Sequence, residues 1–240
     1  MIRHSLLIAS RINRQFLRDR RFLGLSLAVP VILMLLLKYV IDSLPSLARF
    51  GIRVSDYSIL VAAYLVHFLA YVLSTIVLVR DRTAGTLGRM FVTGYVGGYS
   101  SVASAQTVLV LLSTRYLFDV KIEEDIVAVV LTVLSLAVVS VGLGLFLSNF
   151  ARNEGQVFPF IPMVVVPSAL LSGLIIPIED LPTVLQWCSY LVPLTWAIKV
   201  LRGVVVDGNA FLTKLAPFLV LLGYGLALLI LASFTLKEKE

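Results

Sequence analysis

Long apolar runs separated by short polar stretches form the main pattern of this 240-residue chain. A helix of about 20 residues can cross the roughly 30 Å hydrocarbon core of a bilayer, and it satisfies its backbone hydrogen bonds internally. The pattern therefore predicts an all-α integral membrane protein with a single transmembrane domain over 1–240. Six spans are expected, at 22–41, 57–79, 102–118, 126–147, 157–176 and 215–236.

The first 21 residues show helical spacing of apolar and basic residues. Five apolar residues fall on one side and five arginines on the other: Ile2, Leu6, Ala9, Ile12 and Phe16 against Arg3, Arg11, Arg14, Arg18 and Arg21. Such a helix can lie in the membrane interface with its apolar side toward lipid. We expect an interfacial helix over 1–21, with a disordered basic tail as the alternative.

Two shorter apolar runs lie between the fifth and sixth spans, within 179–206. They are TVLQWCSYLV and LTWAIKVLRGVVV, and Pro193 separates them. Each has about 10 to 13 residues, which is too few to cross a bilayer. We expect two re-entrant or interfacial helices here. The alternative is one kinked seventh span, which would place the C-terminus outside.

Lysine and arginine are distributed unevenly about these spans. With six spans and a cytoplasmic N-terminus, twelve of the 20 Lys and Arg residues fall on the cytoplasmic side, seven fall outside, and Lys38 lies within the first span. Basic residues accumulate in cytoplasmic loops. We therefore expect a multi-pass protein of the cell (plasma) membrane with both termini cytoplasmic.

The net charge of +6 does not require a nucleic-acid partner. Six of the basic residues lie in the first 21 positions, beside the first span. Basic groups placed there can meet the anionic headgroups of membrane lipid. We therefore expect lipid, and not nucleic acid, to be the partner of this charge.

Composition and motifs indicate no enzyme. The chain is 59% hydrophobic and 14% charged, whereas soluble domains are about 25% charged. It contains neither a GxxxxGK[ST] P-loop nor an HExxH motif, and His4 and His67 are not spaced as metal ligands. Cys188 is the single cysteine, so an intramolecular disulfide is excluded. We expect no catalysis, no cofactor and no metal site, and an energy source outside these residues.

A few polar side chains and prolines within the spans are candidates for a substrate pathway. His67 lies midway along the second span and Gln106 lies in the third. Polar groups at this depth either serve function or form hydrogen bonds between helices, and both roles fit His67. Pro162 and Pro167 interrupt the fifth span and leave carbonyls unpaired, which is tolerated where a helix faces protein or water. We predict these four residues as pathway positions and the fifth span as the pore-lining helix.

Three stretches of the chain carry recognisable motifs in a fixed order. They are DRTAGTLGRMFVTG (81–94), GLGLFLSNFARNEGQVFPF (142–160) and LSGLIIPIEDLPTVLQWCSYLVPLTWAIKVLRGVVVDG (171–208). Together they resemble the membrane subunit of type-2 ABC exporters, a group that exports drugs, lipids and polysaccharides. The first is similar to the family's acidic-Arg-acidic-x-Gly-Thr motif, with Thr83 in place of the second acid and Gly94 where proline is common. Val192 stands where asparagine usually precedes the proline of the third stretch.

The resemblance implies a mechanism. Two permease subunits, a homodimer or a pair of paralogues, would each rest on an ABC ATPase made as a separate chain, with 81–93 as the coupling helix. The residues expected to contact that ATPase are Asp81, Arg82, Thr83, Gly85, Thr86, Leu87, Arg89 and Met90. The chain would then be a non-catalytic permease that moves an amphipathic, lipid-like, drug or glycan substrate. A membrane-embedded lipid-modifying enzyme and a passive channel are the alternatives.

The residue pattern of 81–93 supports a coupling helix independently. Thr83 can cap a short helix, and Arg82 and Arg89 are available for acidic partners. At helical spacing the apolar residues of the segment share one face: Leu87, Met90 and Phe91. A membrane-surface helix without a partner is the alternative. The following residues, 94–100, are expected to form a flexible turn into the third span.

Overall fold

A computed structural model describes residues 10, 12–14, 18, 20–43, 54–83, 92–118 and 125–235. Regular structure within these ranges is helical. The elements are α2 (Arg20–Asp42), α4 (Val54–Thr83), α5 (Val92–Phe118), α6 (Ile126–Ser148), η2 (Glu154–Gln156), α7 (Val157–Leu171), η3 (Ile178–Asp180), α8 (Thr183–Ser189), α9 (Pro193–Leu201), η4 (Arg202–Val206), η5 (Phe211–Lys214) and α10 (Leu215–Thr235).

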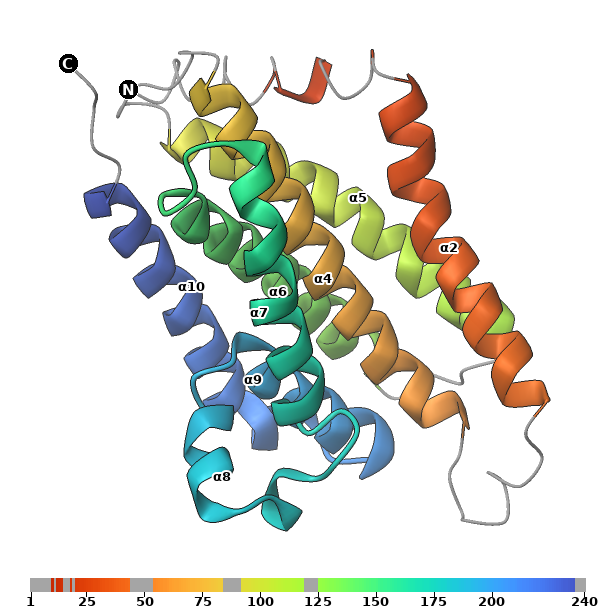
Figure 1. Ribbon diagram of the computed structural model, residues 1–240. Coiled ribbons are helices and arrows are strands. Elements are labelled where there is room, and N and C mark those ends of the chain that lie inside the picture. The colour runs from red at the N-terminus through yellow and green to blue at the C-terminus, as the bar shows by residue number, and fades with distance from the viewer. Residues whose placement is uncertain are drawn as a thin grey trace.

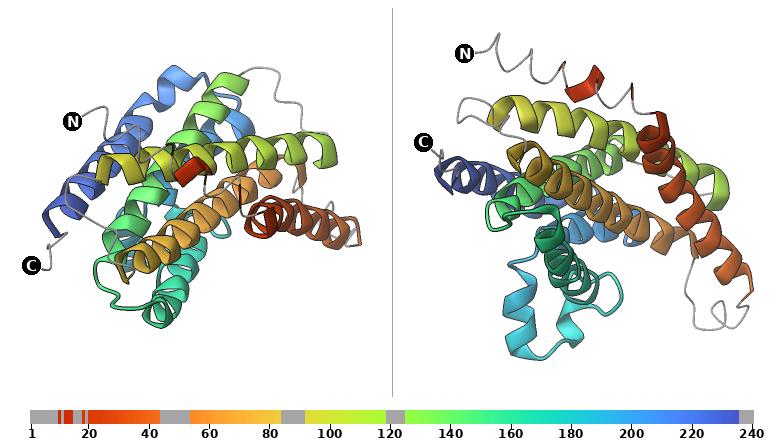
Figure 2. Two further views of the ribbon diagram at one scale, coloured as in Figure 1. Left: turned by 90° about the horizontal axis from the view of Figure 1, so that it is seen from above. Right: turned by 45° about the horizontal axis from the view of Figure 1, so that its top comes forward.

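The long helices form a bundle with two distinct ends (Figure 1). One end, called here the connector end, holds the last described residue of α4, Thr83, and the first of α5, Val92. Helix α2 begins and α10 ends at this same end, and η2 joins α6 to α7 there. The opposite end, the hairpin end, holds α8 and α9. Figure 2 shows α2 at the periphery beside α5, and α7 and α8 to one side of the other helices.

Helix α6 lies at the centre of the bundle, where it packs against α4, α5, α9 and α10. It approaches α4 closely at Gly144, where an added Cβ would lie 2.1 Å from the Oγ of Ser74 and 2.8 Å from the carbonyl oxygen of Tyr71. Small residues permit such close approach between membrane helices. Gly144 therefore sets the spacing that brings α4 side chains within reach of α6.

Among the described residues, five helices are long and apolar enough to cross a membrane. They are Tyr57–Asp81, Gly94–Phe118, Ile126–Ser148, Glu154–Leu171 and Phe211–Ala232. In α2 the corresponding apolar stretch, Ala28–Val40, is shorter. The predicted all-α membrane fold is confirmed, and the protein is a multi-pass membrane protein. The count of six spans, which includes α2, stays a prediction.

The third span begins earlier than its sequence indicates. Helix α5 starts at Val92, so 94–100 continues the helix and the expected flexible turn is wrong. Tyr95 and Tyr99 on these first turns are buried, and their rings stack with centroids 6.0 Å apart. Burial of this aromatic face outweighs the low helix propensity of the glycines between them.

The second span is helical beyond the expected Val79, through Thr83, the last described residue before 92. Asp81, Arg82 and Thr83 therefore belong to α4, and the capping of a further helix by Thr83 stays a prediction. The remainder of the predicted coupling helix, 84–91, lies outside the described residues. Most of the predicted interfacial helix over 1–21 also lies outside them.

The fifth span is shorter than expected, because α7 ends at Leu171 and not at Ile176. Gly173 takes a φ of +82°, a backbone conformation that glycine adopts without steric cost and that interrupts a right-handed helix. The residues 172–176 then lead to the hairpin end.

The two short helices expected within 179–206 are present as α8 and α9. Helix α9 continues into η4, a π-helical turn, and the bend between α8 and α9–η4 is 91°. Helix α9 is largely buried, whereas Trp187 in α8 is 71% exposed. Whether the segment is re-entrant or a bent crossing stays a prediction.

Candidate functional site

Three polar side chains on one face of α4 reach α7. Tyr64, His67 and Tyr71 are three and four residues apart, which places them on the same side of a helix. The Oη of Tyr71 donates to the carbonyl oxygen of Phe160 at 3.0 Å, and that of Tyr64 donates to Val165 at 3.5 Å. Few side chains of α7 are buried, and these polar contacts from α4 add to its packing against α4, α8 and α9.

His67 joins three helices and is fully buried. Its Nδ1 lies 2.7 Å from the Oγ of Ser140 in α6, and its Nε2 lies 3.3 Å from the Oγ of Ser168 in α7. Ser140 already donates its hydroxyl hydrogen to the carbonyl oxygen of Leu136 at 2.6 Å. With that hydrogen given to Leu136, Ser140 accepts from His67, and this hydrogen-bond pattern assigns the proton of the neutral ring to Nδ1 and leaves Nε2 to accept from Ser168.

A groove with a volume of about 490 Å³ lies between α6, α7 and α10, next to this cluster. Its lining consists of Leu143, Phe146, Met163, Val164, Pro167, Ser168, Leu191, Val192, Pro193, Tyr224, Ala227, Leu228 and Leu231. The volume is in the range of small-molecule sites. No lining residue is charged, and among the described residues no three His, Cys, Asp or Glu side chains gather as metal ligands. The groove can therefore bind through apolar contact and hydroxyl groups.

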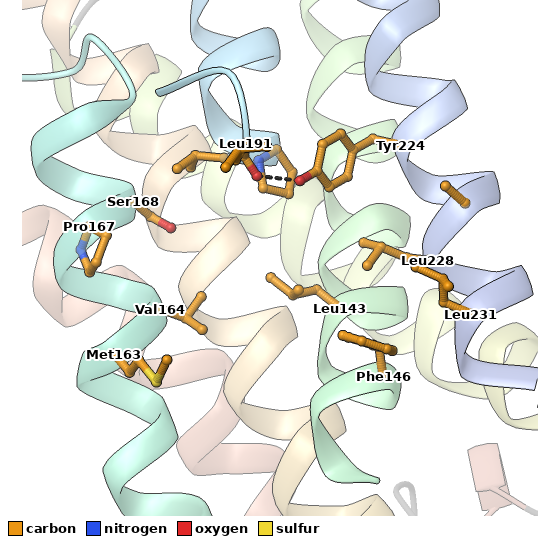
Figure 3. A pocket seen from close by; sticks show the side chains of 13 residues that line it. Leu143, Phe146, Met163, Val164, Pro167, Ser168, Leu191, Tyr224, Leu228 and Leu231 are labelled. Atoms are coloured by element: carbon orange, nitrogen blue, oxygen red, sulfur yellow. Dashed lines mark hydrogen bonds between the residues drawn. The ribbon is translucent and has the colours of Figure 1, made fainter. Parts of the chain in front are cut away.

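The turn between α8 and α9 closes one end of the groove. The Oη of Tyr224 in α10 donates to the carbonyl oxygen of Leu191, as Figure 3 shows. Leu191, Val192 and Pro193 line the groove at this end. At the other end Phe146 and Leu231 line it, near the C-terminal ends of α6 and α10. The groove thus extends from the α8–α9 turn toward the connector end.

The structure brings part of the predicted pathway to this groove. Pro167 lines it, and His67 stands behind the lining residue Ser168. Gln106 instead borders a much smaller void between α4, α5 and α6, and Pro162 is exposed on α7 outside the groove lining. The transport role of these residues stays a prediction.

At the connector end, one residue predicted to contact the ATPase has a partner within the chain. A side-chain hydrogen bond joins Asp81 at the end of α4 to Tyr99 in α5. Tyr99 is 4% exposed, and Asp81 is half-buried. The Asp81 carboxylate therefore links α4 to α5, the two helices that flank 84–91, and its partner Tyr99 belongs to the same chain.

The N-terminal segment also docks at this end. Ile12 was expected to face lipid, but it is buried against Gly98 of α5, where an added Cβ would lie 2.9 Å from the Ile12 Cβ. The Oγ of Ser101 lies 2.7 Å from Oδ1 of Asn13. Gly98 thus provides the space in which the N-terminal segment contacts α5, whereas Arg14 and Arg18 are exposed as expected.

Sequence reasoning missed the serines that complete the His67 cluster and the tyrosine that holds the α8–α9 turn. One signal was present: Tyr64, His67 and Tyr71 share a face of the second span, and buried tyrosine hydroxyls seek partners. The helices that carry the partners, Ser140, Ser168 and Tyr224, cannot be paired from spacing along one sequence.

Comparison with known proteins agrees with this architecture. Residues 4–206 match the family described as ABC-2 type transporter. The chain is 29% identical over 179 residues to ABC transporter G family member 20 of Dictyostelium discoideum, which covers 70% of this chain and 24% of that protein. It is 30% identical over 115 residues to the linearmycin resistance permease protein LnrN of Bacillus subtilis, covering 48% and 30%. It is 25% identical over 180 residues to the inner membrane transport permease YhhJ of Escherichia coli, covering 71% and 48%.

The chain spans less than half of the length of each of these relatives, from 24% to 48%. The family match nevertheless covers α2, α4, α5, α6, α7, α8 and α9, including the groove wall on α6 and α7 and the turn that closes it. The chain therefore belongs to the ABC-2 type transporter family, whose type-2 ABC permeases the three sequence stretches resemble.

Proposed function

We propose that this chain is the permease subunit of an ATP-driven exporter and that a separate ABC ATPase supplies the energy. The groove between α6, α7 and α10 carries the proposal: three membrane helices form its walls, and the α8–α9 turn closes it at one end. A cavity within the membrane that is closed on one side suits alternating access to a substrate. A relative named as a resistance permease supports a small-molecule cargo.

The connector end is the proposed cytoplasmic side. This orientation puts both chain ends and the 84–91 connector on the side where ATP is hydrolysed, and it agrees with the excess of Lys and Arg in those segments. The Asp81–Tyr99 hydrogen bond links α4 and α5 on either side of the connector. Residues 81–93 would then contact the ATPase, with Leu87, Arg89 and Met90 facing that partner.

A second permease copy, identical or paralogous, would complete the transporter. Helix α7 supports this part of the proposal, because several of its large apolar side chains are exposed among the residues that the structure describes. Phe158, Met163, Val166 and Leu170 are exposed along it. In the proposed assembly the chain itself catalyses no reaction, and motion of the paired permeases follows closure of the paired ATPases.

Co-purification and transport together test this function. The chain would be expressed with a candidate ABC ATPase, purified, and reconstituted in vesicles to measure ATP-dependent export. We expect the two chains to co-elute, and we expect Arg82→Glu and Met90→Ala to reduce both co-elution and export. If both variants form the complex and export as well as the original chain does, the coupling assignment fails.

A further inference from the structure

A lysine on α9 lies against two aromatic rings at the hairpin end. The Nζ of Lys199 is 4.4 Å from the centre of the Tyr190 ring and 5.2 Å from that of the Trp196 ring. The centres of the two rings are 5.7 Å apart, and Nε1 of Trp196 donates to the carbonyl oxygen of Tyr190 at 3.1 Å. An ammonium group is attracted to the faces of such rings. The ring pair therefore fixes where the charge of Lys199 lies.

This ammonium group has three N–H donors and needs an acceptor. Among the residues that the structure describes, no oxygen accepts a hydrogen bond from Lys199 and no carboxylate forms a salt bridge with it. Arg202, three residues further along, differs, because its guanidinium donates to the carbonyl oxygen of Gly173 at 2.6 Å. The donors of Lys199 are therefore available to an acceptor outside the described part of the chain.

The surroundings of Lys199 indicate where that acceptor lies. Val184 and Trp187 on α8 and Leu191 in the turn are exposed, and α8 stands to one side of the other helices in Figure 2. Trp and Tyr are enriched where the hydrocarbon of a bilayer meets the head groups, and Lys extends from there toward the head groups. The hairpin thus has the composition of an element of the membrane interface, with its ammonium group at head-group level.

An anionic phosphate oxygen fits this cation. Phosphate forms strong hydrogen bonds with ammonium donors, and salt screens a partly buried ion pair less than an exposed one. Lys199 is the only charged residue within 181–201, and the acids that precede α8, Glu179 and Asp180, are exposed. We propose that Lys199, Tyr190 and Trp196 bind the phosphate of an anionic phospholipid in the leaflet that faces the hairpin end. This lipid is a partner of the hairpin and not the cargo of the groove.

The two tryptophans of the chain, Trp187 and Trp196, both lie in this hairpin, so intrinsic fluorescence reports on it alone. The full chain would be reconstituted in phosphatidylcholine vesicles with increasing amounts of a lipid brominated in its acyl chains, which quenches nearby tryptophan. We expect phosphatidylglycerol to quench at mole fractions about fivefold lower than phosphatidylcholine or diacylglycerol, which lacks phosphate. Added salt should reduce this preference. Equal quenching by the three lipids would overturn the proposal.

Matched substitutions test whether Lys199 causes the preference. Lys199→Gln removes the charge and should abolish it, whereas Lys199→Arg should keep it, because a guanidinium also stacks on aromatic rings. Lys214→Gln is the control: Lys214 packs against Gly203, and among the described residues no aromatic ring holds its ammonium group. We expect the control to retain the preference. Equal losses in Lys199→Gln and Lys214→Gln would show a general effect of charge and would contradict the site.

Free phosphate in solution is the other source of the same chemistry. Glycerol phosphate added to the phosphatidylglycerol vesicles should leave the quenching unchanged, because it lacks the acyl chains that hold a lipid at the interface. Relief of quenching by glycerol phosphate would identify a site for soluble anions and would overturn the lipid assignment. No ATPase and no transported substrate take part in these measurements, so their failure would leave the proposed function standing.

Discussion

The Nδ1 of His67 in α4 donates a hydrogen bond of 2.7 Å to the Oγ of Ser140 in α6. This bond links the helix that leads to the connector with the central helix of the bundle. The other ring nitrogen faces Ser168, which lines the groove. The buried imidazole of His67 therefore connects the packed core to the less buried helix α7. Loss of its hydrogen bonds weakens the contacts of α4 with both α6 and α7.

Substitutions of His67 should separate its two hydrogen bonds. In His67→Ala, Ser140 and Ser168 both lose their hydrogen-bond partner, and we expect a loss of about 2–4 kcal/mol in the free energy of unfolding. His67→Asn can keep a donor near Ser140 while it removes the acceptor of Ser168, so a smaller loss is expected. The midpoint of heat-induced unfolding in detergent measures this. Equal loss in the two variants would show that the hydrogen bond to Ser140 contributes no stability.

The tyrosines of α4 should differ in how strongly they hold α7. Tyr71→Phe removes a 3.0 Å bond to Phe160, and a net loss of about 1 kcal/mol is expected. Tyr64→Phe removes a contact at 3.5 Å and should change little. Amide hydrogen exchange in the first turns of α7 should accelerate in the first variant and not in the second. Faster exchange in both, or in neither, would contradict these roles.

Gly144 should tolerate no side chain at its contact with α4. An alanine Cβ would lie 2.8 Å from the Tyr71 carbonyl oxygen, which belongs to the backbone, so the two helices must separate. We expect Gly144→Ala to destabilise the protein by about 1–3 kcal/mol. Gly223→Ala is the matched control, because nothing lies within 4 Å of the added Cβ. Heat-induced unfolding of the two variants should differ clearly, and similar midpoints would contradict the packing.

The contact between Ile12 and Gly98 should hold the N-terminal segment on α5. Gly98→Ala places a Cβ 2.9 Å from the Ile12 Cβ, which we expect to displace the segment and to increase its cleavage by protease. Ile12→Gly in the same chain removes that Cβ together with the Cδ1 and Cγ2 that lie 2.9 and 3.0 Å from the added atom, and it should restore protection. Gly24→Ala, with nothing within 4 Å of its Cβ, is the control. Failure of the second substitution to rescue would show that the two residues act separately.

The length of the apolar runs was enough to predict the long helices where a span is uniformly apolar. The fourth span was expected at 126–147, and α6 runs from Ile126 to Ser148. The prediction failed where local composition and tertiary packing conflict. The glycines at Gly97 and Gly98 suggested a turn, but burial of Tyr95 and Tyr99 keeps these residues helical.

The candidate site was less accessible to sequence reasoning than the fold. A polar residue such as His67 within a span signals a partner, but the partner's helix depends on which faces meet in three dimensions. Ser140 and Ser168 are ordinary residues in apolar runs, and the groove exists because α7, α10 and the α8–α9 turn surround one side of α6. The turn reaches Tyr224 through a backbone carbonyl, which carries no side-chain signal.

Disulfide cross-linking between the connector and the ATPase tests the central claim most directly. In a Cys188→Ser background, Met90→Cys would be paired with single cysteines on the surface of the co-purified ATPase that is expected to contact residues 81–93. Leu219→Cys, an exposed position in α10, is the control. The account predicts cross-linking at position 90 that changes when ATP is added, and none at position 219. Cross-linking at position 90 no stronger than at position 219, with or without ATP, would contradict it.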